Sequence, residues 1–450
     1  MNSSISDRAV AVNNKSSVYA WYVVLLCMLA YIFSFIDRQI LALMIEPIKA
    51  DLNLSDTQFS LLHGLAFSLF YAFMGLPLAY LADRFSRPKI IAVGIIFWSI
   101  ATALCGLSKN FIQLFFSRMG VGVGEAALSP AVYSMFSDMF SKDKLGRAVA
   151  VYSIGSFVGG GIAFLVGGYV IGLLKDLSLI EIPIFGAVKA WQMAFILVGL
   201  PGIFIGLLFV LTVRDPKRKG QSVNAKGEVE KVTIRAAFTF LKKHRKTFTC
   251  HYLGFTFYAM ALYCLISWSP AFFMRKFSMT PTEAGYMLGT VLLVANTLGV
   301  FCAGWLNDWL IQKGRKDAPM ITGVIGIVGL VLPLVAFTQV SEYWLAVTLL
   351  APAMFFASFP MPISTTAMQM LAPNQLRAQI SAIFLLISNL VAVGIGTTLV
   401  ALVTDKIFEN PLMVGTSLSI VGGIACVLSF VLLKKGCKAF AESMQREHSA

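Results

Sequence analysis

The sequence predicts an all-α membrane protein in which twelve transmembrane helices form two pseudo-symmetric six-helix bundles. Hydrophobic residues make up 58% of the 450 residues and charged residues only 13%. Soluble proteins average about 45–50% apolar and about 25% charged residues, so this composition indicates a polytopic membrane protein. The chain divides into twelve apolar runs, each close to the roughly twenty residues that a helix needs to cross a bilayer. The second half of the chain also repeats features of the first.

The apolar runs fall into two sets of six, and one long polar segment separates the sets. The first bundle, 20–213, has predicted spans at 20–46, 57–82, 89–107, 111–139, 145–174 and 190–213. The second bundle, 247–433, has predicted spans at 248–274, 283–311, 319–339, 343–371, 376–403 and 412–433. Residues 1–19 and 434–450 are predicted to be cytoplasmic tails, and 214–246 a basic cytoplasmic linker.

Basic residues are concentrated on one side of the predicted membrane. Of the 36 Lys and Arg residues, 27 lie on the side of the two termini and 7 on the other side. Cytoplasmic loops carry such an excess, so we expect both termini in the cytoplasm and the protein in the plasma (inner) membrane. This topology accounts for the net charge of +14 without a nucleic-acid partner. Within the linker, Ile234–Lys246 is either a basic amphipathic helix on anionic lipid or a solvated loop.

Two short segments recur at an offset of about half the chain. The segment AYLADRFSRPK follows span 2 and GWLNDWLIQKGRK follows span 8, which places Asp83 and Asp308 225 residues apart. LGRAVAVYS and LRAQISAIF likewise begin spans 5 and 11, with Arg147 and Arg377 offset by 230. A duplicated six-helix unit joined by a loop is the plan of many secondary transporters.

These features resemble the major facilitator superfamily over essentially the whole chain. Within it, FSFIDRQILALMIEPIKADLNLSDTQFSLL and SRMGVGVGEAALSPAVYSMFSDMF look most like the spinster branch, which contains carriers of sphingolipids and lysophospholipids. The chain departs from the superfamily loop motif, because Ala79 and Ser86 stand where glycines are usual and Pro88 is inserted. Span 5 also lacks the proline of the antiporter motif, so the resemblance implies no direction of transport.

Four charged residues are predicted inside the membrane, Asp37 and Arg38 in span 1 and Arg118 and Glu125 in span 4. A charge near the bilayer centre costs roughly 2.5–3.5 kcal/mol on insertion scales, so such residues are seldom without a role. The helical rise puts Asp37 and Arg118 at similar depth, with Glu125 about two turns deeper. Burial favours a protonated carboxyl group and a nearby arginine favours the carboxylate. We therefore predict that Asp37 and Glu125 exchange protons during transport; the alternative is a structural salt-bridge network.

The second half has no acidic residue at comparable depth and instead offers aromatic and hydroxyl groups. Such a wall suits the tail of an amphiphile better than a sugar. The two arginines would hold an anionic head group, although any one of the uncharged residues could equally be a packing or lipid-facing residue. Pro270, Pro352, Pro360 and Pro362 are expected to interrupt spans 7 and 10. The predicted substrate-binding residues are Arg38, Arg118, Tyr31, Tyr258, Tyr263, Trp268, Ser364, Thr365 and Asn389.

By the resemblance, the repeated aspartates form cytoplasmic gates with helix N-termini of the opposite bundle, where the helix dipole favours an anion. Asp83 would meet the start of span 11 near Leu376, and Asp308 the start of span 5 near Leu145. The surrounding basic residues either add charge pairs or simply follow the positive-inside rule. The predicted gate residues are Asp83, Arg84, Arg87, Lys89, Arg147, Asp308, Arg315 and Arg377.

Signals for an enzyme or a bound cofactor are weak. Gly120-Val-Gly-Val-Gly lies within an apolar span and follows no strand, so it indicates close helix packing and not a dinucleotide site. The chain has no GxxxxGK[ST] motif, and its four histidines have no metal-ligand spacing. We therefore expect no enzyme activity, no metal and no cofactor other than a coupling proton. The expected partners are the bilayer and a small substrate, and the expected state is a monomer.

The sequence thus predicts a proton-coupled secondary transporter that works by alternating access. The preferred substrate is an anionic amphiphile such as a lysophospholipid or a sphingosine-phosphate-like lipid. The alternatives on the same scaffold are a proton-coupled carrier of small organic anions or drugs, and a lipid scramblase or sensor.

Overall fold

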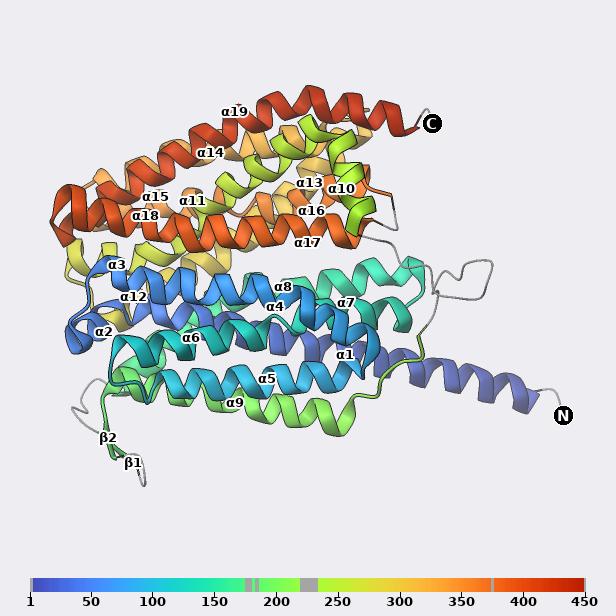
Figure 1. The fold of residues 1–450 in the computed structure, drawn as a ribbon, viewed down its shortest axis with the longest axis horizontal. Helices are drawn as coiled ribbons and strands as arrows, with labels where there is room; N and C mark the ends of the chain where they lie inside the picture. The colour runs from blue at the N-terminus through green and yellow to red at the C-terminus, as the bar shows by residue number, and fades with distance from the viewer. Residues whose placement is uncertain (1–2, 175–179, 183–185, 219–233, 374–375, 449–450) are drawn as a thin grey trace.

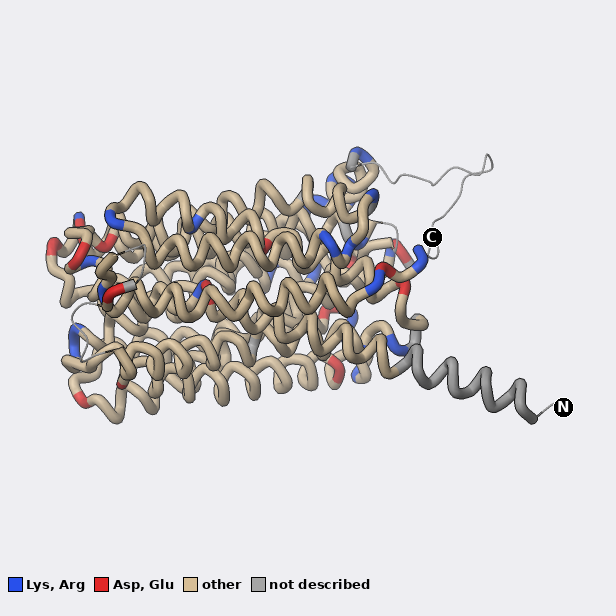
Figure 2. Tube along the Cα trace, turned by 90° about the horizontal axis from the view of Figure 1, so that it is seen from below, with Lys and Arg blue, Asp and Glu red and all other residues tan. Residues whose placement is uncertain are grey.

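Two layers of long, roughly parallel helices make up the protein, and both chain ends lie at the same end of these layers (Figure 1). The computed structural model describes residues 3–174, 180–182, 186–218, 234–373 and 376–448. We call the end that carries the termini the terminal side and the opposite end the distal side. Charged residues gather at these two ends and are sparse between them (Figure 2), as expected for helices that cross a bilayer.

The first layer, here the N bundle, is formed by the helices before residue 213. Its elements are α1 (Ser3–Leu43), α2 (Ile45–Leu52), α3 (Asp56–Ser60), the π-helix η1 (Leu61–Leu65), α4 (Ala66–Arg84), α5 (Arg87–Cys105), α6 (Phe111–Glu125), α7 (Leu128–Met139), α8 (Lys142–Leu174) and α9 (Ala190–Thr212). A two-stranded hairpin, β1 (Ile180–Ile182) with β2 (Gly186–Val188), lies between α8 and α9. The sequence did not predict this hairpin.

The second layer, here the C bundle, follows the short helix α10 (Ile234–Lys243). Its elements are α11 (Arg245–Phe277), α12 (Pro281–Val291), η2 (Leu292–Asn296), α13 (Thr297–Gln312), α14 (Ala318–Gln339), α15 (Tyr343–Ala357), α16 (Pro360–Leu371), α17 (Arg377–Ser388), η3 (Asn389–Gly396), α18 (Thr397–Leu402), η4 (Val403–Phe408), η5 (Pro411–Met413) and α19 (Val414–His448).

The predicted all-α membrane fold with twelve helices is confirmed. In the described ranges, eleven continuous helical stretches are long and apolar enough to cross a membrane. The remaining predicted span, 111–139, is present as α6 and α7, which are separated at Ala126 and Ala127. This break follows directly after Glu125, one of the four charged residues predicted inside the membrane.

The expectation about prolines needs correction. Pro270 does not interrupt its span, because α11 continues through it to Phe277; a membrane helix tolerates proline where neighbouring groups satisfy the freed carbonyl. Span 10 is interrupted as expected, at Ser358 just before Pro360, but Pro352 and Pro362 lie within α15 and α16 without a break.

The linker ends in the helix α10. Ala237 and Phe240 of this helix are buried against protein, whereas Phe238 is exposed.

The bundles touch along two seams where glycines let the helix backbones approach closely. In one seam α8 crosses α12 and η2: a Cβ atom at Gly161 would lie 2.7 Å from Leu293, and one at Gly168 would lie 3.2 Å from the Cα atom of Gly285. In the other seam, η1 meets η3 and α18, and a Cβ atom at Gly64 would lie 2.4 Å from Thr397. Small residues serve the same purpose in other membrane helix contacts.

We predict that Gly161→Ala destabilises the protein by about 1–3 kcal/mol, because the new methyl group overpacks the α8 seam. Gly160→Ala is the matched control, since a Cβ atom at Gly160 has no heavy atom within 4 Å. Thermal unfolding of both purified variants measures the difference. Equal melting temperatures for the two variants would show that the seam is not tightly packed.

Candidate functional site

The predicted charged residues of α1 and α6 meet inside the N bundle. Arg38 Nε donates to Glu125 Oε2 at 2.5 Å, and a second guanidinium nitrogen of Arg38 also pairs with this oxygen. Ser34, one turn earlier on α1, donates to the same carboxylate oxygen at 2.6 Å. The side chain of Glu125 is fully buried and that of Arg38 is 15% exposed. The pair therefore has one side toward the protein interior and one toward accessible space.

Asp37 and Arg118 lie beside this pair. Arg118 Nη1 donates to the backbone carbonyl of Asp37 at 3.1 Å, so the two residues are at the similar depth that the sequence predicted. Both are buried, and the polar neighbours of the Asp37 carboxyl group include Trp98 and Thr102 of α5. Among the described residues, neither Asp37 Oδ1 nor Glu125 Oε1 has a hydrogen-bond partner. Each carboxyl group thus keeps one oxygen free to receive a proton.

Aromatic rings enclose the Arg38 guanidinium. Its Cζ atom lies 4.5 Å from the ring centre of Phe67 and 5.1 Å from that of Tyr71, both on α4. Phe35 on α1 contributes a third ring at 5.0 Å. Aromatic faces attract a guanidinium and keep water away from it. The three rings therefore hold the Arg38 side chain in place while it stays positively charged. In this arrangement a carboxyl group can gain or lose a proton, and the Arg38 guanidinium can bind an anion.

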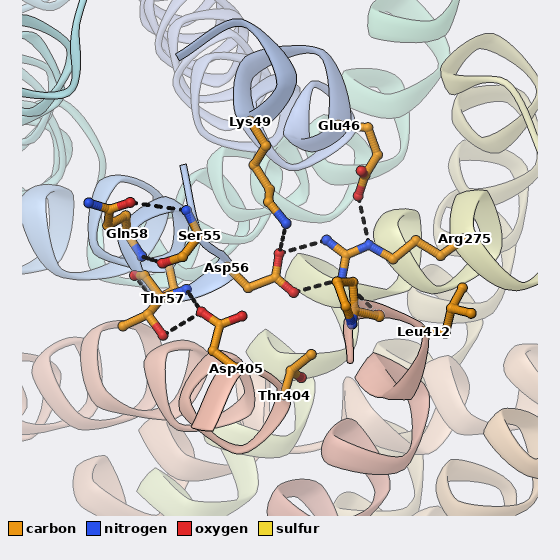
Figure 3. Close-up of polar contacts among 12 residues, drawn as sticks. Glu46, Lys49, Ser55, Asp56, Thr57, Gln58, Arg275, Thr404, Asp405 and Leu412 are labelled. Carbon is orange, nitrogen blue, oxygen red and sulfur yellow. Dashed lines mark hydrogen bonds and ion pairs between the residues drawn. The ribbon is translucent and has the colours of Figure 1, made fainter. Parts of the chain in front are cut away.

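The distal side of the protein is closed by ion pairs between the bundles, which we call the distal clasp (Figure 3). Arg275 at the end of α11 donates to both carboxylate oxygens of Asp56, at 2.6 and 2.7 Å, and to Glu46 at 2.7 Å. Lys49 also pairs with Asp56, whose side chain is fully buried. Alongside the clasp, the backbone and hydroxyl groups of Thr57 both donate to Asp405 at 2.7 Å.

One further contact joins the bundles closer to the middle of the membrane. His63 of η1 shares a hydrogen bond of 2.9 Å with Ser267 of α11, and both residues are buried. The hydrogen bonds that Thr57, His63 and Arg275 make between the N and C bundles all lie in this distal half. The sequence predicted no role for His63, because its partner is 204 positions away.

Comparison with known proteins identifies the family. The family model described as Major Facilitator Superfamily matches residues 27–397. The chain belongs to the Major Facilitator Superfamily. It is therefore a multi-pass membrane transporter and not an enzyme.

Relatives of this Major Facilitator Superfamily chain support its spinster-like character. It is 26% identical over 95% of its length to a bacterial homologue of the human lysosomal transporter spinster, solved inward-facing and unoccupied, with a TM-score of 0.76 and 97% of that chain covered. It is 26% identical to protein spinster of Drosophila melanogaster over 70% of its own length, and spans about half the length of that protein (51%). It is also 29% identical to an MFS-type efflux pump of Mycolicibacterium smegmatis, over 87% of this chain and 86% of the relative.

The spinster-like fold brings some predicted substrate residues to the space between the bundles and leaves others elsewhere. Tyr263 lines a cavity between the bundles, and Tyr31 stacks on Tyr152 at 4.7 Å within the N bundle. Tyr258 and Trp268 do not line that cavity: they are buried in the C bundle and donate to the carbonyls of Phe356 and Thr397. Three other predicted residues do not line the cavity either. Ser364 is buried, Thr365 is exposed, and the side-chain amide of Asn389 donates to a carbonyl of its own helix.

The predicted gate residues of the transporter lie on the terminal side. Asp308 is exposed and receives a hydrogen bond from its neighbour Asn307, so it makes no described contact near Leu145 in this arrangement. The side chain of Asp83 lies outside the described part of the structure. The gates remain a prediction for a state in which the terminal side closes. Arg84, Lys89, Arg147, Arg315 and Arg377 are all exposed.

Arg87 differs from the other predicted gate residues because it is 1% exposed. It pairs with Asp138 of α7, and its Nε and Nη2 atoms donate to Asp215 at 2.9 Å and to the carbonyl of Pro216 at 2.7 Å. These contacts fasten the start of α5 to α7 and to the start of the linker. Arg87 is therefore an anchor within the N bundle and not a free gate charge.

We predict that Arg87→Gln destabilises the transporter by about 3–5 kcal/mol, because it leaves buried charge uncompensated. The exposed Lys89, two residues along the same helix, supplies the control Lys89→Gln, which is expected to change stability little. Thermal unfolding in detergent measures both variants. A wild-type melting temperature for Arg87→Gln would contradict the anchor role.

Proposed function

We propose that this spinster-like protein is a proton-coupled secondary transporter of an anionic amphiphile, such as a lysophospholipid or a sphingosine-phosphate-like lipid. The observation that carries the proposal is the buried pair of Arg38 and Glu125, with Asp37 and Arg118 beside it. Intramembrane ionisable residues of this kind mark proton relays and substrate pathways. We further propose that both termini are cytoplasmic and that the protein resides in the plasma membrane, which makes the present arrangement inward-facing.

Coupling follows from competition for one guanidinium. While Glu125 is ionised, it holds Arg38 at 2.5 Å. A proton on Glu125 removes that attraction and frees Arg38 for an anionic head group, so proton binding and anion binding favour each other. Asp37 provides a second carboxyl group next to Arg118. The aromatic rings around Arg38 and the apolar C bundle offer surface for the chain of an amphiphile.

A second candidate substrate is a small organic anion. The chain is 25% identical over 354 residues to a probable L-galactonate transporter of Escherichia coli, covering 74% of this chain and 72% of that relative. A sugar acid would use the same two arginines for its carboxylate but would need additional polar groups for its hydroxyls. Both candidates share the proton site and differ in what the rest of the cavity binds.

We predict that Glu125→Gln abolishes uptake driven by a pH gradient; the protein still folds, but its melting temperature falls because Arg38 loses its charged partner. The amide cannot lose a proton, so the competition for Arg38 no longer responds to pH. The measurement is uptake of labelled 1-oleoyl lysophosphatidate and of labelled D-glucuronate into proteoliposomes, with and without an imposed gradient. Glu342→Gln, at an exposed glutamate on the distal side, is the control and should behave as wild type.

Retention of the wild-type pH dependence in Glu125→Gln would refute the assignment. Transbilayer movement of lipid by the wild type that is independent of any gradient would instead favour a scramblase.

We predict that Asp56→Asn shifts the population toward the outward-open state. Asp56 is fully buried and paired with both Arg275 and Lys49, and loss of one partner from a buried ion pair costs about 3–5 kcal/mol. Spin labels at Lys109 and Ser341, on exposed distal loops of the two bundles, measure the opening. Glu46→Gln should have a smaller effect, because Glu46 is 38% exposed. An unchanged distance distribution for Asp56→Asn would exclude the clasp as a gate.

A further inference from the structure

A small cavity lies between the two bundles near the middle of the membrane, separate from the charged pairs. Its volume is about 30 Å³. A cavity needs roughly 10–15 Å³ on this measure to hold one water molecule, so it has room for a single small polar group. Residues of both bundles line it, among them Gln39 of α1, Ser156 of α8, Tyr263 of α11, Asn296 of η2, Ser358 and Phe35.

Two of these residues carry side-chain amides with unused hydrogen-bonding capacity. Gln39 is 5% exposed and Asn296 is 8% exposed. Neither Gln39 Oε1 nor Asn296 Oδ1 has a hydrogen-bond partner among the described residues. Buried amides are nearly always hydrogen-bonded in proteins, because an unpaired one is costly. Two such amides in one cavity, one from each bundle, therefore indicate a place where a polar group binds.

The backbone around Asn296 is built to present it. Asn296 ends the π-helix η2, a local widening within the long α12–α13 helix, and such widenings occur often at functional sites. Ser358 stands at the break between α15 and α16. Gly299 lies one turn beyond Asn296, and a Cβ atom there would lie 2.2 Å from Ser358 Oγ, so these two irregular helices are in direct contact. Discontinuous helices supply binding sites near the midplane of many transporters.

The chemistry of the cavity selects a neutral hydroxyl group. Ser156 and Ser358 each donate to a carbonyl of their own helix, so their oxygens remain acceptors toward the cavity. An amide offers both a donor and an acceptor, and a hydroxyl group matches both. A cation is disfavoured, because Tyr263 lies within electrostatic reach of Arg38 and the charged cluster becomes positive when a proton binds.

We propose that Gln39 and Asn296 form a specificity site that binds a hydroxyl group of the substrate while Arg38 and Arg118 bind its anionic group. The inference rests on the proposed function and narrows it: the substrate is an anion that carries a hydroxyl group near its charge. Such a group occurs both in the glycerol of a lysophospholipid and in a free sugar acid. Because one amide belongs to each bundle, the substrate hydroxyl also joins the bundles when it binds.

The test compares two pairs of probes that differ in their hydroxyl groups. One pair is 1-oleoyl lysophosphatidate and oleyl phosphate, and the other is D-glucuronate and cyclohexanecarboxylate. Binding to the purified full-length protein is measured by thermal shift without a pH gradient. We expect the wild type to bind the hydroxylated member about tenfold more tightly in at least one pair, the effect of gaining one or two hydrogen bonds. The pair that shows the preference identifies the source of the hydroxyl.

Gln39→Leu and Asn296→Leu should each remove most of this preference and leave the affinity for the hydroxyl-free member unchanged. Asn307→Leu is the matched control, because Asn307 is also a buried amide whose Oδ1 atom has no hydrogen-bond partner among the described residues, but it does not line the cavity. The melting temperatures of the unliganded Gln39→Leu and Asn296→Leu proteins should be unchanged or raised, since an unpaired buried amide does not stabilise the fold.

Three results would overturn the inference. In the first, the wild type binds both members of each pair equally. In the second, the leucine variants keep the preference, or their affinity for both members of a pair falls by the same factor. In the third, the leucine substitutions lower the melting temperature, which would mark the amides as structural. Binding of none of the four probes would overturn the inference together with the anion substrate, whereas binding without discrimination would overturn the inference alone.

Discussion

The ion pair between Arg38 and Glu125 is the constraint on which the N bundle depends. Neither charge is stable alone in a bilayer, so α1 and α6 must be held near enough for the two side chains to meet. The glycines of α6 bring that helix against α4 and α5: a Cβ atom at Gly122 would lie 2.5 Å from the carbonyl oxygen of Phe67, and one at Gly124 would lie 2.8 Å from that of Gly94. The helix breaks directly after Glu125.

The two bundles contribute different kinds of interaction. The N bundle holds the intramembrane charges, whereas the central part of the C bundle offers amides, hydroxyls and aromatic rings. Arg275 is the exception, since it extends from the end of α11 to acidic residues of the N bundle. Charge pairing therefore closes the distal side, and neutral contacts such as the one between His63 and Ser267 continue that closure toward the centre.

The fold was predictable because hydropathy alone locates membrane helices and the half-length repeat reveals the two bundles. The charged cluster was also predictable, since an acid or arginine stands out within an apolar span. Gln39, His63 and Asn296 were not, because a neutral polar residue in such a span gives no signal of the direction it faces. The buried state of Arg87 depends on Asp215, 128 residues away. Likewise, Tyr258 is buried in the C bundle with its hydroxyl group donating to the carbonyl of Phe356, 98 residues away, which sequence spacing cannot reveal.

The glycine seams at Gly64, Gly161 and Gly168 have a consequence for how the halves exchange positions. Where side chains of two helices interdigitate, one helix must move away from the other before it can rotate, and many contacts are lost together. At these glycines no side chain of the N bundle projects toward the C bundle, so each half can rotate against the other as a rigid body while its own interior stays intact. Because all three glycines lie in the distal half, a small rotation about them moves the terminal side further than the distal side.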